Sequence, residues 1–109
     1  MSQRVAKVES LVRQVVATQL PVSLGREAAW VTVTAVDVSP DLRHAIVWIG
    51  ALGDDAKQTS LMKLLLSASG DIQRAVGGKM STKFVPRIEF KLDGGGEYAA
   101  KIDRLLKDL

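Results

Sequence analysis

The start of the chain has the hydrophobic spacing of an amphipathic helix. Between residues 3 and 19, apolar side chains recur at intervals of three and four, at Val5, Val8, Leu11, Val12, Val15 and Val16. This spacing places them on one helical face, and Ser2 stands where an N-terminal cap is expected. We expect the helix to end near Pro21 and Gly25, because proline and glycine both disfavour its continuation.

Two segments rich in β-branched residues follow, and their alternation predicts an antiparallel hairpin. The first strand covers residues 30–37 and is expected to separate Val31, Val33 and Ala35 from Trp30, Thr32, Thr34 and Val36. The second covers residues 43–51 and is expected to separate Ala45, Val47 and Ile49 from His44, Ile46 and Trp48. Between them, Pro40 presets φ, while Ser39 and Asp41 can bond the nearby backbone. So short a turn joins antiparallel neighbours.

Helical spacing returns over residues 55–79, with one interruption. Asp54 stands as the N-cap of a first stretch, residues 55–68, whose inward side chains are Leu61, Leu64, Leu65 and Ala68. The pattern resumes over residues 71–79 and ends at two glycines. Glycine inside a helix costs about 1 kcal/mol relative to alanine. We therefore predict two helices with a kink between them at Ala68-Ser69-Gly70.

A third strand is predicted after Pro86, and a closing helix over residues 97–109. In the strand, Ile88, Phe90 and Leu92 alternate with charged residues. The long helical crossover allows this strand to run parallel to its neighbour. We expect an α+β fold with a three-stranded mixed sheet and helices on one face. One domain should occupy residues 1–109, with a core over residues 3–93.

Composition narrows the class of protein. With 109 residues and 47% apolar residues, the chain suits one globular domain rather than a disordered segment. It has no cysteine and one histidine, His44, which excludes disulfides, thiolate zinc sites and most catalytic triads. The first 20 residues lack the continuous apolar stretch of a signal peptide, and no run approaches the roughly 20 apolar residues of a membrane span. We expect a cytoplasmic protein that contacts no membrane and uses no metal or cofactor.

Positive charge is concentrated in one stretch of the chain. Residues 74–91 contain five Lys or Arg residues and one Glu, a net charge of +4, whereas the whole chain carries +3. A local cationic face is typical of polyanion binding, and a helix N-terminus at the kink would offer backbone N–H groups to a phosphate. The candidate RNA-binding residues are Ala68, Ser69, Gly70, Arg74, Lys79, Lys83 and Arg87 and, on the first helix, Arg4, Lys7 and Arg13.

Structural interpretations of the same residues stay open. A kink also lets two helices pack around a sheet, and Asp71 can satisfy the amides that a phosphate would use. Asp54 and Asp55 fit a helix cap better than acid–base catalysis, and His44 fits a strand surface. The aromatic residues lie in patterns typical of buried side chains, which gives base stacking little support: Trp30, Trp48, Phe84, Phe90 and Tyr98.

Four segments together resemble the bacterial ribosome-binding factor A family. They are residues 33–42 (VTAVDVSPDL), 45–49 (AIVWI), 68–74 (ASGDIQR) and 85–93 (VPRIEFKLD). The resemblance covers residues 3–109 and implies a type II KH-like fold, in which Ala68-Ser69-Gly70 replaces the usual Gly-x-x-Gly loop. Residues 23–27 differ from the Asp-Pro-Arg stretch common in the family, and the chain ends at Leu109 without the basic tail of many members.

The resemblance also implies a function. Such factors are not enzymes; they bind the immature 30S small ribosomal subunit, assist late maturation of its 16S rRNA and support growth in the cold. The expected partners are the 30S subunit, its 16S rRNA and an assembly GTPase, and we expect the chain itself to be a monomer. The alternative is a protein-interaction module that uses the same fold without RNA, since aromatic residues are few and the net charge is modest.

Overall fold

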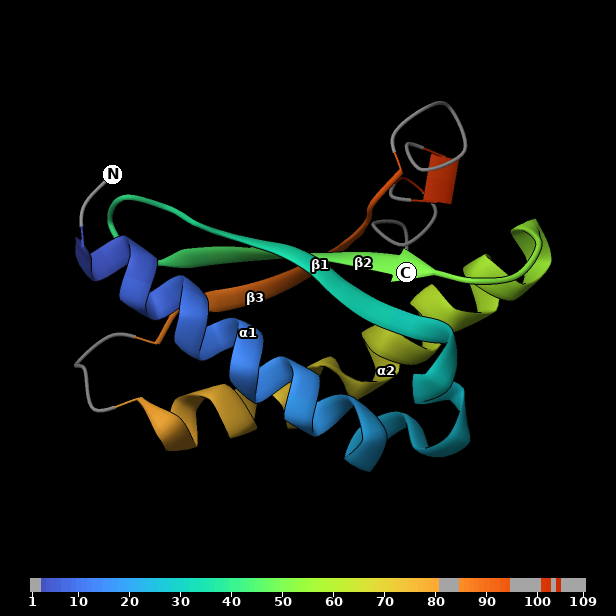
Figure 1. The fold of residues 1–109 in the computed structure, drawn as a ribbon, viewed down its shortest axis with the longest axis horizontal. Helices are drawn as coiled ribbons and strands as arrows, with labels where there is room; N and C mark the ends of the chain where they lie inside the picture. The colour runs from blue at the N-terminus through green and yellow to red at the C-terminus, as the bar shows by residue number, and fades with distance from the viewer. Residues whose placement is uncertain (1–2, 81–84, 95–100, 103, 105–109) are drawn as a thin grey trace.

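The computed structural model describes residues 3–80, 85–94, 101, 102 and 104. Its strands and long helices come in the predicted order, with one helix where two were predicted between the second and third strands. The elements are α1 (Gln3–Leu24), the short 3-10 helix η1 (Gly25–Trp30), β1 (Val31–Val38), β2 (His44–Ala51), α2 (Asp55–Lys79) and β3 (Arg87–Leu92). β2 is the central strand, with β1 antiparallel and β3 parallel to it. Both long helices lie on one face of this sheet (Figure 1). The predicted α+β class and mixed sheet are therefore confirmed.

The core lies between the sheet and the two long helices. From β2, Ala45, Val47 and Ile49 are buried, as the alternation predicted. The helices contribute their apolar faces, which are Val5, Val8, Val12, Val16, Leu20 and Leu24 from α1, and Leu61, Met62, Leu65, Ala68, Ile72 and Val76 from α2. Burying one large aliphatic side chain is worth about 1.5–3 kcal/mol. Packing therefore compensates for the weak helix propensity of the valines in α1.

The first helix is longer than predicted. Pro21 lies inside its last turn, and the helix ends at Leu24. Proline removes the hydrogen bond to the carbonyl four residues earlier. That residue, Ala17, is exposed like Pro21, so water can replace the lost donor. Leu20 and Leu24 are buried, and their packing holds this last turn against the core.

β1 contains a bulge that its alternation did not predict. The pairing register with β2 shifts between Val33 and Ala35. Such an irregularity exchanges the two faces of the strand beyond it. Val36 and Val38 are consequently both buried, although Val36 was predicted to share a face with Thr32, which is exposed.

The second helix is a single element. It continues from Asp55 to Lys79, so the predicted division into two helices at Ala68-Ser69-Gly70 is wrong. Its 25 residues span about 37 Å at 1.5 Å per residue, which is close to the longest dimension of the molecule, 38 Å. Ala68 and Ile72 on either side of the glycine are buried. Their burial outweighs the modest propensity cost of Gly70.

The predicted C-terminal helix is described at three positions. Lys101, Ile102 and Arg104 are helical, and Ile102 is buried in the core, as its place on the predicted apolar face requires. The other residues of the range 97–109 lie outside the described residues. The assignment of residues 1–109 to one domain stays a prediction.

Candidate nucleic-acid interface

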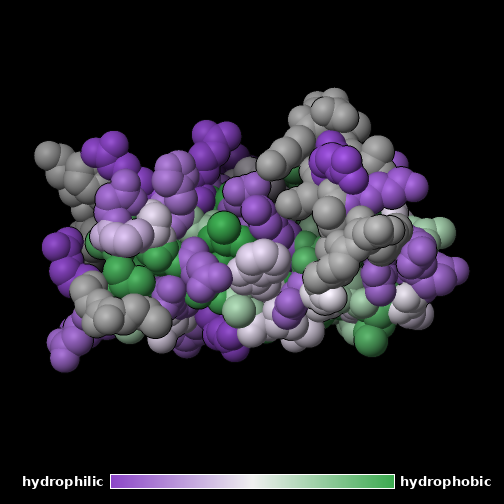
Figure 2. All heavy atoms as spheres, turned by 90° about the horizontal axis from the view of Figure 1, so that it is seen from above, coloured by the Kyte–Doolittle hydropathy of each residue, from purple (hydrophilic) through white to green (hydrophobic). Residues whose placement is uncertain are grey.

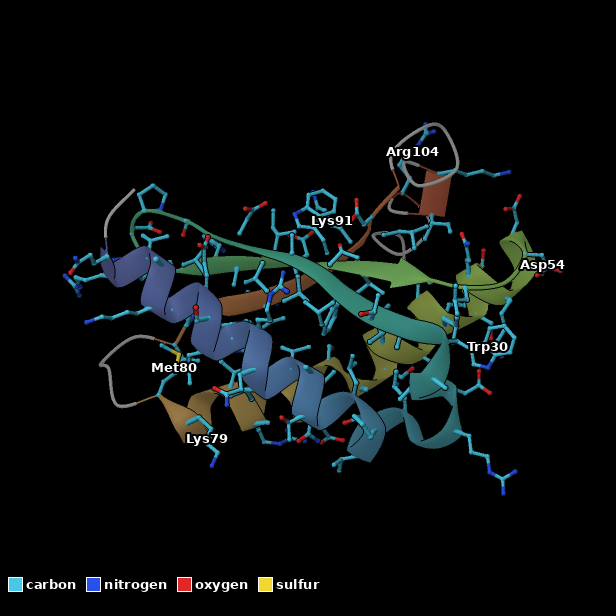
Figure 3. The ribbon with its side chains drawn as sticks, viewed as in Figure 1. Trp30, Asp54, Lys79, Met80, Lys91 and Arg104 are labelled. Atoms are coloured by element: carbon cyan, nitrogen blue, oxygen red, sulfur yellow. The ribbon has the colours of Figure 1, made fainter. Side chains whose placement is uncertain are left out.

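Several of the predicted cations lie at one end of the molecule. Arg4 and Lys7 belong to the first turns of α1, Lys79 is the last residue of α2, and Arg87 is the first residue of β3. All four are exposed. Figure 1 shows the beginning of α1, the end of α2 and the beginning of β3 at the same end, and Figure 3 labels Lys79 there. The fold therefore brings together side chains that are widely separated in the sequence.

Arg43 belongs to the same surface, although the sequence analysis did not include it. It lies in the turn between β1 and β2, where its backbone oxygen accepts a hydrogen bond from Arg87 N at 2.8 Å. The two arginines are far apart in the sequence, and only the parallel pairing of β2 with β3 makes them neighbours. We call this surface the basic end and define it as Arg4, Lys7, Arg43, Lys79 and Arg87.

Hydrogen bonds hold the turn that carries Arg43. Ser39 Oγ donates to Asp41 Oδ1 at 2.6 Å, and Arg43 N donates to the same oxygen at 3.1 Å. Ser39 Oγ also accepts from His44 N at 3.0 Å, so the predicted role of Ser39 and Asp41 in the turn is confirmed. The bond from Ser39, and next the bond from the Arg43 backbone, lowers the pKa of Asp41 below its ordinary value. The carboxylate that organises the turn therefore stays charged at neutral pH.

A groove borders the outer edge of β3 beside the middle of α2. A part of about 400 Å³ is lined by Ser69, Gly70, Gln73, Val85, Arg87 and Ile88. An adjoining part of about 340 Å³ shares Ser69, Arg87 and Ile88 with it and extends along the strand to Phe90. The structure thus places three predicted candidates, Ser69, Gly70 and Arg87, in one groove.

Gln73 determines how α2 and β3 meet in this groove. Its Nε2 donates to Pro86 O at 2.8 Å, and its Oε1 accepts from Ile88 N at 2.8 Å. The side-chain amide thereby bonds the edge of β3 in the way that the backbone of another strand would. Arg87 lies between the two bonded residues, so Gln73 also holds the backbone that carries this arginine. No local signal marked Gln73, because its partners belong to another element.

The predicted phosphate site at the kink is wrong. Because α2 is continuous, the amides of Asp71 and Ile72 lie inside a helix and not at a second N-terminus. Ala68, the first residue of the predicted site, is buried in the core and cannot contact a ligand. The amides that were expected to face a phosphate are therefore part of the helical hydrogen-bond pattern.

Ser69 and Gly70 still line the groove, where they present little side-chain bulk. Ser69 Oγ donates to Leu66 O at 2.7 Å, so this hydroxyl is bound to its own helix. A Cβ added at Gly70 would meet only Arg74 Nη1, at 3.7 Å, which is ordinary van der Waals contact. Packing within the chain does not require glycine here. Because Gly70 has no side chain, it instead leaves the helix backbone uncovered where α2 borders the groove.

Two of the predicted cations have partners within the chain. Arg13 Nη2 donates to Thr34 O at 2.9 Å, next to the bulge of β1 and across the sheet from β3. Its role is structural, and the structure does not bring it to the groove. Arg74 pairs with Asp71 one turn earlier on α2, and both side chains are exposed. Exposed pairs of this kind are weak, so Arg74 stays accessible beside Gly70. Lys83 lies outside the described residues.

The aromatic side chains are less buried than predicted. Trp48 is half-buried on the outer face of the sheet, where its indole Nε1 donates to Asp37 Oδ2 at 2.9 Å. Figure 2 shows this face, on which apolar and weakly polar residues lie among charged ones. Trp30 is 40% exposed, so its predicted burial is wrong. Phe90 is half-buried, and Phe84 and Tyr98 are outside the described part of the chain.

The polar residues weighed for catalysis have structural positions. His44 is exposed at the start of β2, and Asp54 Oδ1 accepts from Lys57 N at 2.8 Å as the N-cap of α2. Both agree with the sequence analysis. Within the described residues, no three His, Asp or Glu side chains gather in a way that could hold a metal ion. No helix among them is long and apolar enough to cross a membrane.

Comparison with protein families gives a match over nearly the whole chain. The family model described as ribosome-binding factor A matches residues 4–106. The chain belongs to the ribosome-binding factor A family. The ribosome-binding factor A of Clostridioides difficile is 38% identical over 106 residues, which cover 95% of this chain and 82% of that protein. That of Rhodopirellula baltica is 30% identical over 106 residues, which cover 96% and 77%. The resemblance seen in the sequence is therefore confirmed.

Solved structures of ribosome-binding factor A share the fold. A Thermotoga maritima protein assigned to this family, solved by NMR, has a TM-score of 0.73 at 25% identity and covers 89% of this chain and 93% of its own. The crystal structure of the Thermus thermophilus factor has a TM-score of 0.67 at 20% identity, with 81% and 93% covered. A homology model of the T. thermophilus factor, fitted into a cryo-EM map of a 30S–RbfA complex, has a TM-score of 0.64 at 21% identity, with 78% and 90% covered. These likenesses confirm the α+β, KH-like architecture.

Proposed function

We propose that this chain is a non-catalytic assembly factor whose basic end contacts the 16S rRNA of the immature 30S subunit. Membership of the ribosome-binding factor A family supports the ribosomal target. The structural relative fitted into a 30S–RbfA map supports the small subunit. The observation that carries the RNA contact is the convergence of exposed cations from α1, α2, β3 and the β1–β2 turn.

Contacts at the basic end are electrostatic. Arginine and lysine side chains bind phosphate oxygens without reading sequence, and each such contact releases counterions. Two carboxylates lie near this surface: Glu9, whose Oε2 accepts from Val38 N at 3.0 Å, and Asp41, which organises the turn. The cations therefore outnumber the carboxylates that face the same solvent.

The groove beside β3 extends this surface. Gly70 presents bare helix between Arg74 and Arg87, which allows a sugar–phosphate strand to approach the α2 backbone closely. Arg87, held by the Gln73 contacts, then lies along one wall of the groove. In this arrangement, binding energy favours one rRNA conformation over others, and no covalent bond is made or broken.

The finer roles follow from the family and form part of the same proposal. They are help in late 16S rRNA maturation, support of growth in the cold, action alongside an assembly GTPase, a cytoplasmic location and a monomeric state. The basic end and the groove suit the role in maturation, because a factor that only binds can act transiently on a folding RNA.

The test is cosedimentation with small subunits at two salt concentrations. The variant K7E/R43E/R87E reverses three cations of the basic end, and K63E/K101E/R104E reverses three exposed cations elsewhere. We expect the first variant to lose about tenfold or more in affinity at low salt. We also expect the slope of log affinity against log salt concentration to become shallower by about two. The reason is that each of the three lost phosphate contacts contributes roughly 0.7–0.9 to this slope. The control variant should bind like the wild type.

Two outcomes would contradict the proposal. Equal binding of the basic-end variant and the wild type at both salts excludes this surface as the RNA contact. Binding that resists salt in the wild type itself indicates apolar contacts and favours the protein-interaction module without RNA. Circular dichroism of both variants controls for folding, because all six substituted side chains are exposed.

A further inference from the structure

The end of the molecule opposite the basic end exposes an apolar surface. Trp30 is 40% exposed and Leu52 is 63% exposed. The two residues are adjacent, because Leu52 N donates to Trp30 O at 2.8 Å. Figure 3 shows Trp30 near Asp54, at the far end of the ribbon from Lys79. We call Trp30 and Leu52 the tryptophan patch. Exposed tryptophan side chains are enriched at protein–protein interfaces, where the large ring supplies contact area.

The indole of Trp30 is held in a fixed position. Lys57 Nζ lies 4.6 Å from the centroid of the ring and 2.5 Å from Glu27 Oε2, so an ion pair keeps the ammonium over one face of the ring. Asp54 fixes the backbone of Lys57 through the N-cap bond of 2.8 Å. The ring is therefore ordered before any partner arrives.

Gly53 completes this arrangement. Its φ of +99° is a conformation that other residues rarely adopt, and a Cβ there would lie 2.7 Å from Lys57 Cγ. The loop that presents Leu52 can therefore pass close to the ring, since the Cβ position of Gly53 is 3.5 Å from Trp30 Cζ3. An aromatic ring that is already positioned loses little conformational entropy on binding. Tryptophan is one of the residue types that most often carry the binding energy of an interface.

The charges around the tryptophan patch indicate the chemistry of its partner. Glu27 and Asp54 both bond Lys57, which lies over the ring. Asp55 and Arg26 are their neighbours in the chain, so three carboxylates stand against two cations in these two segments. A phosphate backbone would meet net negative charge here, whereas a cationic polypeptide would be attracted. The patch therefore disfavours RNA, in contrast to the basic end, and combines an apolar anchor point with an acidic rim.

We propose that the tryptophan patch docks a basic protein segment of the small ribosomal subunit, an inference that rests on the proposed function. An apolar side chain of the partner packs on Trp30 and Leu52, while its Lys or Arg residues face the carboxylates of Glu27, Asp54 and Asp55. The factor then holds rRNA at one end and a protein at the other. This arrangement limits stable binding to particles in which both partners are in place.

The experiment compares two probes, which are intact small subunits and protein-free 16S rRNA. The variants are L52S and W30S/L52S, and the matched control is V22S, which removes an aliphatic side chain that is 75% exposed elsewhere. We expect L52S to weaken binding to intact subunits about threefold and W30S/L52S about tenfold or more. Binding to protein-free rRNA should not change, and V22S should resemble the wild type with both probes.

A second measurement identifies the partner even if W30S/L52S is poorly folded. The photoreactive substitution Leu52→p-benzoylphenylalanine is made in the full chain, which is then irradiated on intact subunits. A cross-link to a basic ribosomal protein supports the inference. Cross-links to rRNA alone, or to a second copy of this chain, overturn it, as does the absence of any cross-link from a chain that binds.

The two proposals fail in different ways. If the wild type binds subunits and both patch variants bind equally well, this inference is wrong and the proposed function stands. If the patch variants lose the same affinity for protein-free rRNA as for subunits, the patch contacts RNA and the inference is again wrong. If the wild type binds neither probe, the proposed function fails, and the inference fails with it.

Discussion

The two ends of the molecule present surfaces of different construction. At the basic end, five exposed cations come from α1, α2, β3 and the β1–β2 turn, and the packing of these elements sets their spacing. At the other end, Glu27, Lys57 and Trp30 touch one another in series, and Gly53 lies against them. One surface is assembled from separate elements, and the other is a connected set of contacts.

This difference agrees with what each surface is proposed to bind. Charge attraction acts over a Debye length of about 8 Å at physiological salt, so a phosphate surface tolerates imprecise placement of its cations. An apolar contact falls off within the distance of direct van der Waals contact, so its side chains must be positioned beforehand. The comparison predicts graded, salt-dependent effects at the basic end and effects of single substitutions at the tryptophan patch.

The largest expected effect comes from breaking the element that joins the two ends. α2 begins beside Trp30 and ends at Lys79, and Gly70 lies inside it. Proline in a helix interior costs about 3 kcal/mol or more, so G70P should lower the free energy of unfolding by about that amount. Urea denaturation followed by circular dichroism measures it.

The matched substitution G70A should act in the opposite direction. The added Cβ meets only Arg74 Nη1, at 3.7 Å, so alanine should stabilise the helix by up to about 1 kcal/mol. A G70P chain as stable as the wild type would mean that α2 is divided at this point after all. Weaker subunit binding by the stabilised G70A chain would support a close approach of RNA at Gly70.

A smaller effect, confined to the basic end, is expected from Q73A. The substitution removes both hydrogen bonds to the start of β3, at a net cost of about 1–2 kcal/mol. Because Arg87 then loses its fixed backbone, affinity for small subunits should also fall. Thermal denaturation and cosedimentation measure the two effects. Q14A, at an exposed glutamine of α1, is the control. If Q73A has the stability and the subunit affinity of the wild type, Gln73 does not position Arg87.

At the tryptophan patch, K57M should have a modest effect on stability. It keeps the aliphatic stem but removes the ion pair with Glu27 and the ammonium over Trp30, which together are worth about 0.5–1 kcal/mol at partly exposed sites. In a W48F background Trp30 is the sole tryptophan, so its fluorescence should shift to the red as the ring becomes more solvated. K63M is the control, and an unchanged spectrum would show that Lys57 does not order the ring.

The smallest effect is expected from D41N in the turn. The pKa of Asp41 is lowered in the folded chain below its ordinary 3.8. A depressed carboxylate pKa stabilises the fold above the unfolded pKa, and this contribution disappears as the pH falls through the folded pKa. The melting temperature of D41N should therefore lie slightly below that of the wild type at neutral pH, and the two should converge in acid. If the difference in melting temperature stays constant to low pH, the effect of D41N does not come from the charge of Asp41.

Local sequence patterns were sufficient for much of the fold. The alternation of β2 predicted its buried face, the spacing of α1 predicted its apolar stripe, and Asp54 marked the start of α2. Each of these features depends on neighbours within one or two turns of the chain. The prediction of exposed cations on α1, α2 and β3 succeeded for the same reason, because charge is a property of each residue.

The failures occurred where distant packing overrode a local preference. Pro21 and Gly70 do not end their helices, since buried residues on both sides keep the helix in place. The bulge of β1 changed the face of Val36, and only the pairing with β2 reveals it. The predicted phosphate site failed because α2 is continuous there and offers no second helix N-terminus.

The sequence by itself determined the order of the strands and long helices, the apolar face of α1, the buried face of β2 and the excess of positive charge. The tertiary structure decided which of those charges share a surface: it placed Arg43 beside Arg87, joined Gln73 to β3 and used Arg13 within the fold. It also left Trp30 exposed at the opposite end. The reason is physical, because periodicity and propensity act between neighbours in the chain, whereas a binding surface depends on the pairing of strands and the docking of helices.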